Sequence, residues 1–263
     1  MFFTDNFAYV HQPKTGGTFV TSVFFRLYNV NWNLRFRAEH MLRREVARSH
    51  RYGTFIYHKN KHGTCAELPI LQQEKLILAT LRNPYELYVS QFEFGWWRRR
   101  DALPHFRAVP EFSRKYPRFP NITFDEYVTL VNAAFVPRGE GISEDAAIGL
   151  WTKEFVRYYL REPDKVLKSL QNPDRRGDLR EAAMFNVRFI MTQRLNEELY
   201  DFLIDAGYDP QDTAFVRDFG KVLPQGKGRR HDQSWERYYT PATKELVKRK
   251  EVHLLSMFPE FDV

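Results

Sequence analysis

A six-residue stretch, Pro-Lys-Thr-Gly-Gly-Thr at 13–18, places a cation, two glycines and two hydroxyls between an apolar run and a helical pattern. A loop that leads from a strand into a helix presents unpaired backbone N–H groups, and glycines permit the positive φ angles that let those groups surround an anion. The helix dipole adds positive charge at the same place. The stretch therefore predicts a site for a phosphate-like group, formed by Lys14, Thr15, Gly16, Gly17 and Thr18.

This loop differs from the nucleotide-binding loop of ATP- and GTP-hydrolysing proteins. Their motif, G-x-x-x-x-G-K-[ST], has its lysine after the last glycine and a hydroxyl that holds Mg²⁺, whereas Lys14 precedes both glycines. The later Gly-Lys-Gly at 226–228 follows no predicted strand, and the run at 75–84 lacks the aspartate of a metal-holding strand. A conventional nucleotide-hydrolysing site is therefore disfavoured.

A second stretch, LRNPYELYVSQF at 81–92, offers another anion contact. The apolar run 75–81 predicts a central strand, and Asn83 followed by Pro84 predicts the start of a helix. Arg82, at the carboxyl end of this strand, can pair with phosphate through two parallel hydrogen bonds. Ser90, on the following helix, can donate its hydroxyl to the same anion.

Both stretches resemble motifs of the sulfotransferases that use 3′-phosphoadenosine-5′-phosphosulfate (PAPS). HQPKTGGT at 11–18 resembles the family's H-x-P-K-T-G-G-T loop, and 81–92 resembles its L-R-[DN]-P-x-x-R-x-x-S-x-[YF] motif. The resemblance implies that the first loop holds the 5′-phosphosulfate and that Arg82 and Ser90 contact the 3′-phosphate. Leu87 stands where the family often has arginine, so a second basic contact is missing or comes from elsewhere.

Other segments are similar to the family with less specificity. FIMTQRLNEELYDFL at 189–203, ITFDEYV at 122–128 and the closing segments 238–250 and 258–263 resemble family patterns. A late basic loop closes over PAPS in related enzymes, and GKGRRHDQS at 226–234 is similar to it. The residues that this similarity assigns to PAPS are Lys227, Arg229 and Arg230.

Sulfuryl transfer to a hydroxyl requires a base for the acceptor's proton and stabilisation of the leaving phosphate. Lys14 suits the second task, because an ammonium gains in effect as negative charge develops beside it. The segment 55–68 offers His58 and His62 as bases. It resembles a family segment whose last histidine is the base in glycan 2-O-sulfotransferases, which implies His62, with His58 as the alternative if the alignment shifts. Glu67 and Glu93 remain other candidates, and His11 is interpreted as support for the loop.

The formal charge of +7 favours an acidic partner. Arginines at 44, 48 and 51 recur at helical spacing, and the triplet 98–100 follows two tryptophans at 96 and 97. Such runs are typical either of a solvated surface or of a cleft for an acidic glycan, in which tryptophan stacks on sugar and arginine pairs with carboxylate or sulfate. Two alternatives stay open: a P-loop-type small-molecule kinase and a basic nucleic-acid-binding module, although no nucleic-acid-binding motif is recognised.

Strands that alternate with helices predict an α/β protein with a central parallel sheet, which the resemblance implies is P-loop-like. We expect one domain over 1–263 with a helical insertion at about 95–185, and an arginine-rich helix at 36–51. The single cysteine, Cys65, favours a reducing compartment, and no transmembrane or signal segment is recognised. The expectation is a cytoplasmic, PAPS-dependent sulfotransferase that needs no metal and acts on the hydroxyl of a glycan or glycolipid.

Overall fold

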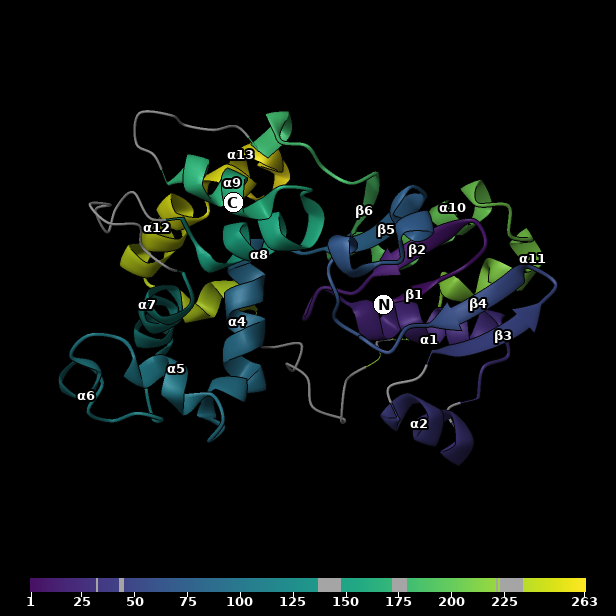
Figure 1. The fold of residues 1–263 in the computed structure, drawn as a ribbon. Helices are drawn as coiled ribbons and strands as arrows, with labels where there is room; N and C mark the ends of the chain where they lie inside the picture. Colours follow the sequence, from purple (N-terminus) through teal and green to yellow (C-terminus); the bar gives the residue numbers. More distant parts are fainter. Residues whose placement is uncertain (32, 43–44, 137–147, 172–178, 221, 223–233) are drawn as a thin grey trace. The chain divides into compact units, whose positions relative to one another are not determined.

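The structure is a computed structural model that describes residues 1–31, 33–42, 45–136, 148–171, 179–220, 222 and 234–263. The chain divides into two compact units, of which the first comprises Met1–Arg82 and Met184–Gly226 and the second Asn83–Ala183 and Lys227–Val263. The first unit holds a sheet and its helices, and the described elements of the second unit are helical (Figure 1). The α/β class is confirmed, and the prediction of one domain over 1–263 stays a prediction.

Across the described residues, the first unit forms one six-stranded sheet with the order β3-β4-β1-β2-β5-β6. The strands β2, β5 and β6 run parallel, whereas β1 and β4 and the edge strand β3 pair antiparallel. The predicted parallel sheet is therefore correct for these three strands only, and the whole sheet is mixed. The strands are β1 Phe2–Phe3, β2 Phe7–Val10, β3 Val46–His50, β4 Gly53–Tyr57, β5 Leu76–Leu81 and β6 Val187–Met191.

Two tight turns explain why the outer strands are antiparallel. Between β1 and β2, the Thr4 hydroxyl oxygen accepts the N–H groups of Asn6 at 3.3 Å and Phe7 at 3.2 Å. Between β3 and β4, Gly53 adopts φ +93°, and a Cβ there would lie 2.1 Å from a carboxylate oxygen of Asp5. A chain that reverses within a few residues can pair only with the strand it has just left, in the antiparallel sense.

The expected arginine-rich helix over 36–51 is wrong in its second half. Helix α2 covers Leu34–Met41, and Val46–His50 then forms the edge strand β3, whose side chains alternate between buried and exposed. Alternation with period two is the pattern of a strand with one buried face, and pairing with β4 overrides the helical spacing of the arginines. On this strand Arg48 pairs with Glu39 at 3.5 Å, and residue 44 lies outside the described residues.

The helices α1 (Gly17–Leu27) and α10 (Leu195–Asp205) cover one face of the sheet (Figure 1). The ring of Phe24 on α1 lies 4.6 Å from that of Phe2 on β1, and Phe202 on α10 lies 4.9 Å from Phe7 on β2. These aromatic contacts belong to one buried cluster that includes alternate residues of the strands. The cluster holds the strands in place, and the candidate site lies in the loops at their carboxyl ends.

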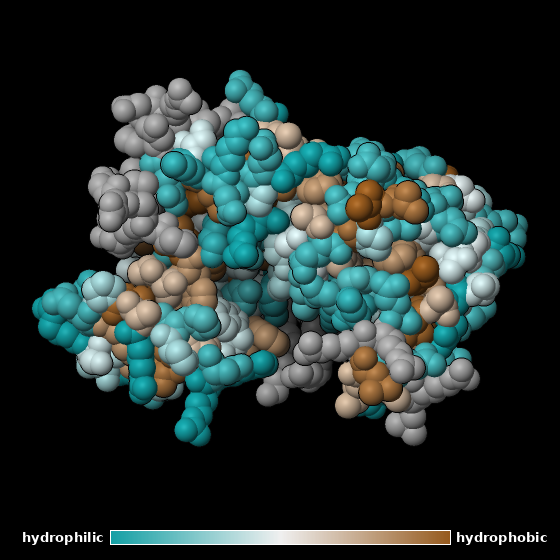
Figure 2. All heavy atoms as spheres, viewed as in Figure 1, coloured by the Kyte–Doolittle hydropathy of each residue, from teal (hydrophilic) through white to brown (hydrophobic). Residues whose placement is uncertain are grey.

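The visible surface of the molecule is mostly hydrophilic, with small hydrophobic patches (Figure 2). One patch lies over α2, where Met41 is 81% exposed and Leu42 67% exposed. Within the described part of the chain, every helix is too short or too polar to cross a membrane.

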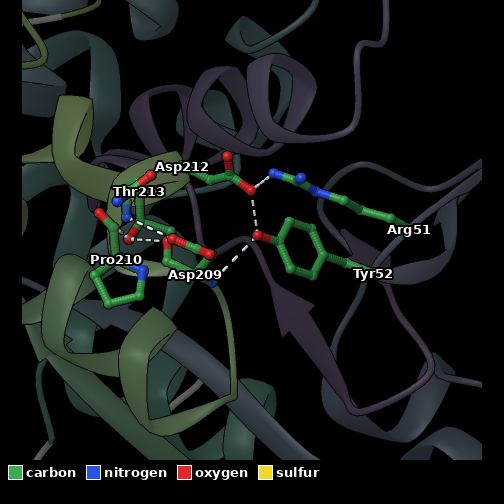
Figure 3. A network of polar contacts seen from close by, with 7 residues as sticks. Arg51, Tyr52, Asp209, Pro210, Asp212 and Thr213 are labelled. Carbon is green, nitrogen blue, oxygen red and sulfur yellow. Dashed lines mark hydrogen bonds and ion pairs between the residues drawn. The ribbon is translucent and has the colours of Figure 1, made fainter.

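A polar network fixes the turn between β3 and β4 to α11 (Pro210–Thr213), as Figure 3 shows. Arg51 forms an ion pair with Asp212, and the Tyr52 hydroxyl donates to the same carboxylate. The backbone N–H of Asp209 donates to the Tyr52 oxygen at 3.1 Å. Arg51 is therefore neutralised within the fold.

A buried carboxylate organises the second unit. Glu251 is fully buried and accepts hydrogen bonds from the backbone N–H groups of Trp151 and Thr152, from the Thr152 hydroxyl and from the Tyr88 hydroxyl. Burial raises its pKa, and these four donors offset part of that rise. The carboxylate stands at the junction of α12 (Pro241–Lys250) with α13 (Val252–Met257) and ties this junction to α4 (Pro84–Phe94) and α8 (Leu150–Tyr159).

Short elements complete the two units. The first unit also contains α3 (Ile70–Gln73) and the turns η1 (Cys65–Glu67), η4 (Thr192–Arg194) and η5 (Ala214–Val216). In the second unit, short helices follow α4 within the predicted helical insertion. The remaining elements of this unit are η2 (Trp96–Arg98), α5 (Leu103–Arg107), α6 (Phe112–Lys115), α7 (Phe124–Phe135), α9 (Pro163–Leu170), η3 (Leu179–Glu181), η7 (Trp235–Tyr238) and η8 (Pro259–Phe261).

Candidate functional site

The loop between β2 and α1 has an unusual backbone conformation. Lys14 and Gly16 both have positive φ, at +71° and +91°, and α1 begins directly after Gly16. The left-handed conformation is free for glycine but costs a lysine about 1–2 kcal/mol. Backbone strain of this kind persists where the surrounding structure enforces it, and it is found most often at functional sites.

The backbone amides of residues 15–18 form no hydrogen bonds to acceptors in the described part of the chain. The first hydrogen bond of α1 runs from the Phe19 N–H to the Gly16 carbonyl at 2.9 Å. Four neighbouring amides at the N-terminus of a helix of eleven residues provide the donors that an anion requires.

Close packing explains both glycines. A Cβ on Gly17 would lie 2.0 Å from Cδ2 of His11, so any side chain there would displace the imidazole. A Cβ on Gly16 would lie 2.8 Å from the Leu195 side chain on α10, in addition to the strain of its positive φ. His11 is 3% exposed and burial lowers its pKa to about 2, so it is neutral. The interpretation of His11 as support for the loop agrees with this packing.

A chain of buried hydroxyls holds the loop on the sheet. The Thr15 hydroxyl donates to the Gln12 carbonyl at 2.8 Å and lies 2.7 Å from the Thr80 hydroxyl of β5, which lies 3.1 Å from the Tyr9 hydroxyl of β2. Because Thr15 uses its proton on Gln12, it must accept the proton of Thr80, and Thr80 that of Tyr9. Thr15 is fully buried, so its side chain supports the loop. Thr18, on the first turn of α1, is partly exposed.

Arg82 lies beside Lys14. Its Nη1 donates to the Lys14 carbonyl at 3.2 Å, so the residue that follows β5 reaches the loop that follows β2. Burial first and the Arg82 charge second lower the pKa of the Lys14 ammonium to about 8. A bound anion between these cations would reverse the second effect, because it stabilises the charged form of both.

Thr192, at the start of η4 after β6, is a loop contact that sequence reasoning missed. Its hydroxyl lies 2.7 Å from the Leu81 carbonyl and 3.4 Å from the Thr15 carbonyl. The carboxyl ends of β2, β5 and β6 thus meet at one edge of the sheet, which is where α/β proteins bind ligands. The segment around TQRL at 192–195 resembles a family pattern. That resemblance did not predict that the Thr192 side chain contacts the glycine loop.

His62 is positioned against the same loop. Its Nδ1 lies 3.1 Å from the His11 carbonyl, and the two imidazole rings meet edge to face at 4.6 Å. A hydrogen bond to a carbonyl requires the proton on Nδ1, which places the lone pair of the neutral ring on Nε2. Partial burial lowers the pKa of His62, and the His11 carbonyl offsets part of this effect. His62 is therefore a neutral imidazole at pH 7, with Nε2 as its basic atom.

His58 is built into the fold instead. It is 6% exposed, its Nδ1 accepts the N–H of Asn60 at 3.1 Å, and its Nε2 lies 3.3 Å from a carboxylate oxygen of Glu45. Both nitrogens therefore have partners within the protein. Of the other candidate bases, Glu67 accepts the Thr64 N–H at 2.8 Å in a capping box, and Glu93 accepts the Tyr238 hydroxyl at 2.9 Å in the second unit.

The other residues that the sequence assigned to PAPS do not belong to the described part of the glycine loop. Ser90 lies on α4 of the second unit and is partly exposed. Lys227, Arg229 and Arg230 lie outside the described residues. Among the residues that the structure describes, no group of three or more histidines, cysteines and carboxylates could hold a metal ion.

Comparison with known proteins assigns no family to the chain. No protein-family model, no curated protein and no solved structure matches the chain.

Proposed function

We propose that this chain is a sulfotransferase that moves a sulfuryl group from PAPS to a hydroxyl of a carbohydrate. The observation that carries the proposal is the hydrogen bond between His62 and the carbonyl of His11, because it brings a neutral base to the loop that presents the open amides. The resemblance of the two motifs to the PAPS-dependent family supports the choice of co-substrate. A P-loop-like fold belongs to the same proposal.

The loop is assigned to the 5′-phosphosulfate. The amides of residues 15–18 and the ammonium of Lys14 would hold its oxygens, and the guanidinium of Arg82 would pair with a phosphate of the nucleotide. These donors are fixed before the ligand arrives, since the buried Thr15 hydroxyl and the Gly17–His11 packing set the backbone. Preorganised donors stabilise developing charge without reorganising during the reaction.

In the proposed reaction, the acceptor's hydroxyl oxygen attacks sulfur in line with the bond to the 5′-phosphate. Nε2 of His62 takes the hydroxyl proton, the new S–O bond forms, and the bond between sulfur and the bridging oxygen breaks. The electron pair stays on the 5′-phosphate of adenosine 3′,5′-bisphosphate, where Lys14 and the amides stabilise it. His62 then releases its proton to water. Ser90 remains a predicted contact to the 3′-phosphate.

The choice of ligand is tested by calorimetric titration of the protein with adenosine 3′,5′-bisphosphate, with ATP and Mg²⁺, and with an oligothymidylate. We expect the bisphosphate to bind and raise the melting temperature by mass action. Tighter binding of ATP with Mg²⁺ would indicate a kinase instead, and salt-sensitive binding of the oligonucleotide alone would indicate a nucleic-acid-binding module.

The base is tested by comparing His62→Gln with His58→Gln in transfer from radiolabelled PAPS to a panel of saccharides. We expect His62→Gln to lower turnover by about 10²–10⁴-fold, the usual contribution of a general base, with bisphosphate affinity unchanged. His58→Gln should instead lower the melting temperature, because it disturbs a buried side chain with two partners. The reverse pattern, with turnover lost only in His58→Gln, would contradict the assignment.

A further inference from the structure

A cavity of about 420 Å³ lies in the second unit, where the chain follows α4. Its lining includes four arginines, namely Arg98, Arg99, Arg100 and Arg107. Ligand pockets commonly have volumes of about 300–1,000 Å³, so the cavity has the size of a small-molecule site. We refer to it as the arginine pocket.

The arginines of this pocket are not neutralised by the fold. Among the described residues, none of the four forms an ion pair with a carboxylate, and the adjacent Asp101 pairs with none of them. Arg98 lies over the Trp97 ring at 4.8 Å, and Arg99 lies 5.6 Å from the Phe94 ring centre. On the neighbouring helix α6, by contrast, Arg114 pairs with Glu111 at 2.7 Å. Exposed cations gathered without counter-charges favour an anionic ligand.

The floor of the pocket is apolar. Phe112 and Tyr116 are 9% and 7% exposed, and the lining also includes Leu103, Phe119, two prolines and the polar Ser113. In this part of the second unit, hydrophilic side chains surround hydrophobic atoms at the surface (Figure 2). Trp97 is fully buried, so the expected stacking of this tryptophan on a sugar is wrong. The surface available to a ligand is therefore a hydrophobic base with a guanidinium rim.

We propose that the arginine pocket binds a saccharide that carries several sulfate or carboxylate groups. A pyranose ring presents C–H groups on its face and its substituents at its edge, which matches an apolar floor bordered by guanidinium forks that pair with oxyanions. A nucleic acid would need an extended basic track along its backbone, whereas these charges surround one cavity. The proposal stands without the sulfotransferase assignment.

The test is calorimetric titration with a trisulfated, uronate-containing disaccharide in the absence of nucleotide. The double variant Arg100→Gln/Arg107→Gln should bind at least about tenfold more weakly, since each arginine supplies charge-assisted hydrogen bonds. The matched control Arg114→Gln/Lys115→Gln removes the same charge from side chains that pair with Glu111, and it should bind as the unaltered chain does. Arg100→Lys/Arg107→Lys should retain part of the affinity, because it keeps charge but loses the fork.

Several outcomes would overturn the proposal. These are no binding by the unaltered chain, equal weakening in the two glutamine variants, or equal affinity for an uncharged disaccharide. Tighter binding of inositol hexakisphosphate would assign the pocket to phosphorylated ligands, and tighter binding of an oligothymidylate would assign it to nucleic acid. Because Arg100 and Arg107 are exposed, melting temperatures of the variants should match, which separates loss of binding from loss of folding.

Discussion

The glycine loop of the first unit and the arginine pocket of the second unit are both suited to anions, but they are built in different ways. In the loop the donors are backbone amides, held by a buried hydroxyl chain and by the contact of Gly17 with His11. In the pocket the donors are exposed guanidinium groups on flexible side chains above an apolar floor. The loop fixes the direction and length of its hydrogen bonds to an anion, whereas the pocket supplies positive charge without fixed hydrogen-bond geometry.

This difference predicts how each site responds to change. The affinity of the loop for its ligand should fall when the backbone shifts by about 1 Å, and it should change little with salt concentration. A ligand of the pocket should tolerate small shifts, and its affinity should fall as salt screens the exposed charges. Substitutions that act on geometry and substitutions that act on charge therefore distinguish the two sites.

The largest expected effect is that of Gly17→Ala. Its Cβ would lie 2.0 Å from the buried His11 ring, so the loop or the ring must move. We expect bisphosphate affinity to fall about a hundredfold, because each misplaced hydrogen bond to a charged phosphate loses about 1.5–3 kcal/mol. Stability should fall by about 1–3 kcal/mol through overpacking. Saccharide binding at the arginine pocket should not change. Calorimetry and urea unfolding measure these effects.

Gly220→Ala is the matched control, because nothing lies within 4 Å of its Cβ position. It should alter stability by less than about 0.5 kcal/mol. If Gly17→Ala binds the bisphosphate as well as this control does, the loop is not geometrically constrained and the comparison fails.

The next effect in size is that of Lys14→Met, which removes charge from the loop but keeps its side-chain length. A charge-assisted hydrogen bond contributes about 1.5–3 kcal/mol, so bisphosphate affinity should fall about 10- to 100-fold. Titration calorimetry measures the loss, with Lys165→Met, which pairs with Glu162 on the surface, as the control. An affinity unchanged by Lys14→Met would mean that the amides bind the anion without the ammonium.

A pH titration should separate the sites with a smaller effect. The pKa of Lys14 is about 8, and the protonated ammonium is the form that binds an anion, so affinity is present below that pH and lost above it. Between pH 7 and pH 9 the bisphosphate affinity should fall about tenfold. Guanidinium groups stay charged over this range, so saccharide binding should be constant. A flat bisphosphate profile in the unaltered chain, or a slope that persists in Lys14→Met, would exclude Lys14 as its origin.

The smallest effect is expected from two matched hydroxyl deletions in the loop. Thr15→Val leaves the Gln12 carbonyl without its donor and should lower the free energy of unfolding by about 1–3 kcal/mol. Thr18→Val removes a partly exposed hydroxyl and should leave stability unchanged while weakening the bisphosphate a few-fold, within the range of about 0.5–1.5 kcal/mol for one hydrogen bond. Urea unfolding and calorimetry should therefore rank the two variants in opposite orders. The same order in both measurements would mean that Thr15 is a direct ligand.

Much of the first unit follows from local sequence. The strand predicted over 75–81 forms as β5, the helical pattern after the glycine loop forms as α1, and the helix start predicted at Asn83 and Pro84 forms as α4. These predictions succeed because apolar runs, asparagine and proline act over a few residues. The edge strand β3 was missed, because its arginines have helical spacing and only its partner β4 decides the conformation. The antiparallel half of the sheet was missed for the same reason.

The sequence indicated which residues lie at the glycine loop, but not how their side chains are arranged there. The motif identified Thr15 as a ligand, yet a hydroxyl that donates to Gln12 at 2.8 Å faces the sheet. The choice between His58 and His62 depended on alignment alone, and it was their hydrogen-bond partners that distinguished them. The triplet 98–100 indicated an anionic partner, but sequence could not show that Trp97 is buried and that residues 112–120 supply the floor.

The most direct test of the loop is the NMR response of its two glycines. Selective ¹⁵N-glycine labelling gives at most 13 amide signals, of which those of Gly16 and Gly17 are assigned by substitution. On titration with adenosine 3′,5′-bisphosphate, both signals should shift in a saturable manner with one dissociation constant, while that of Gly220 stays fixed. If the nucleotide binds but the signals of Gly16 and Gly17 do not move, the anion lies elsewhere and the account is wrong.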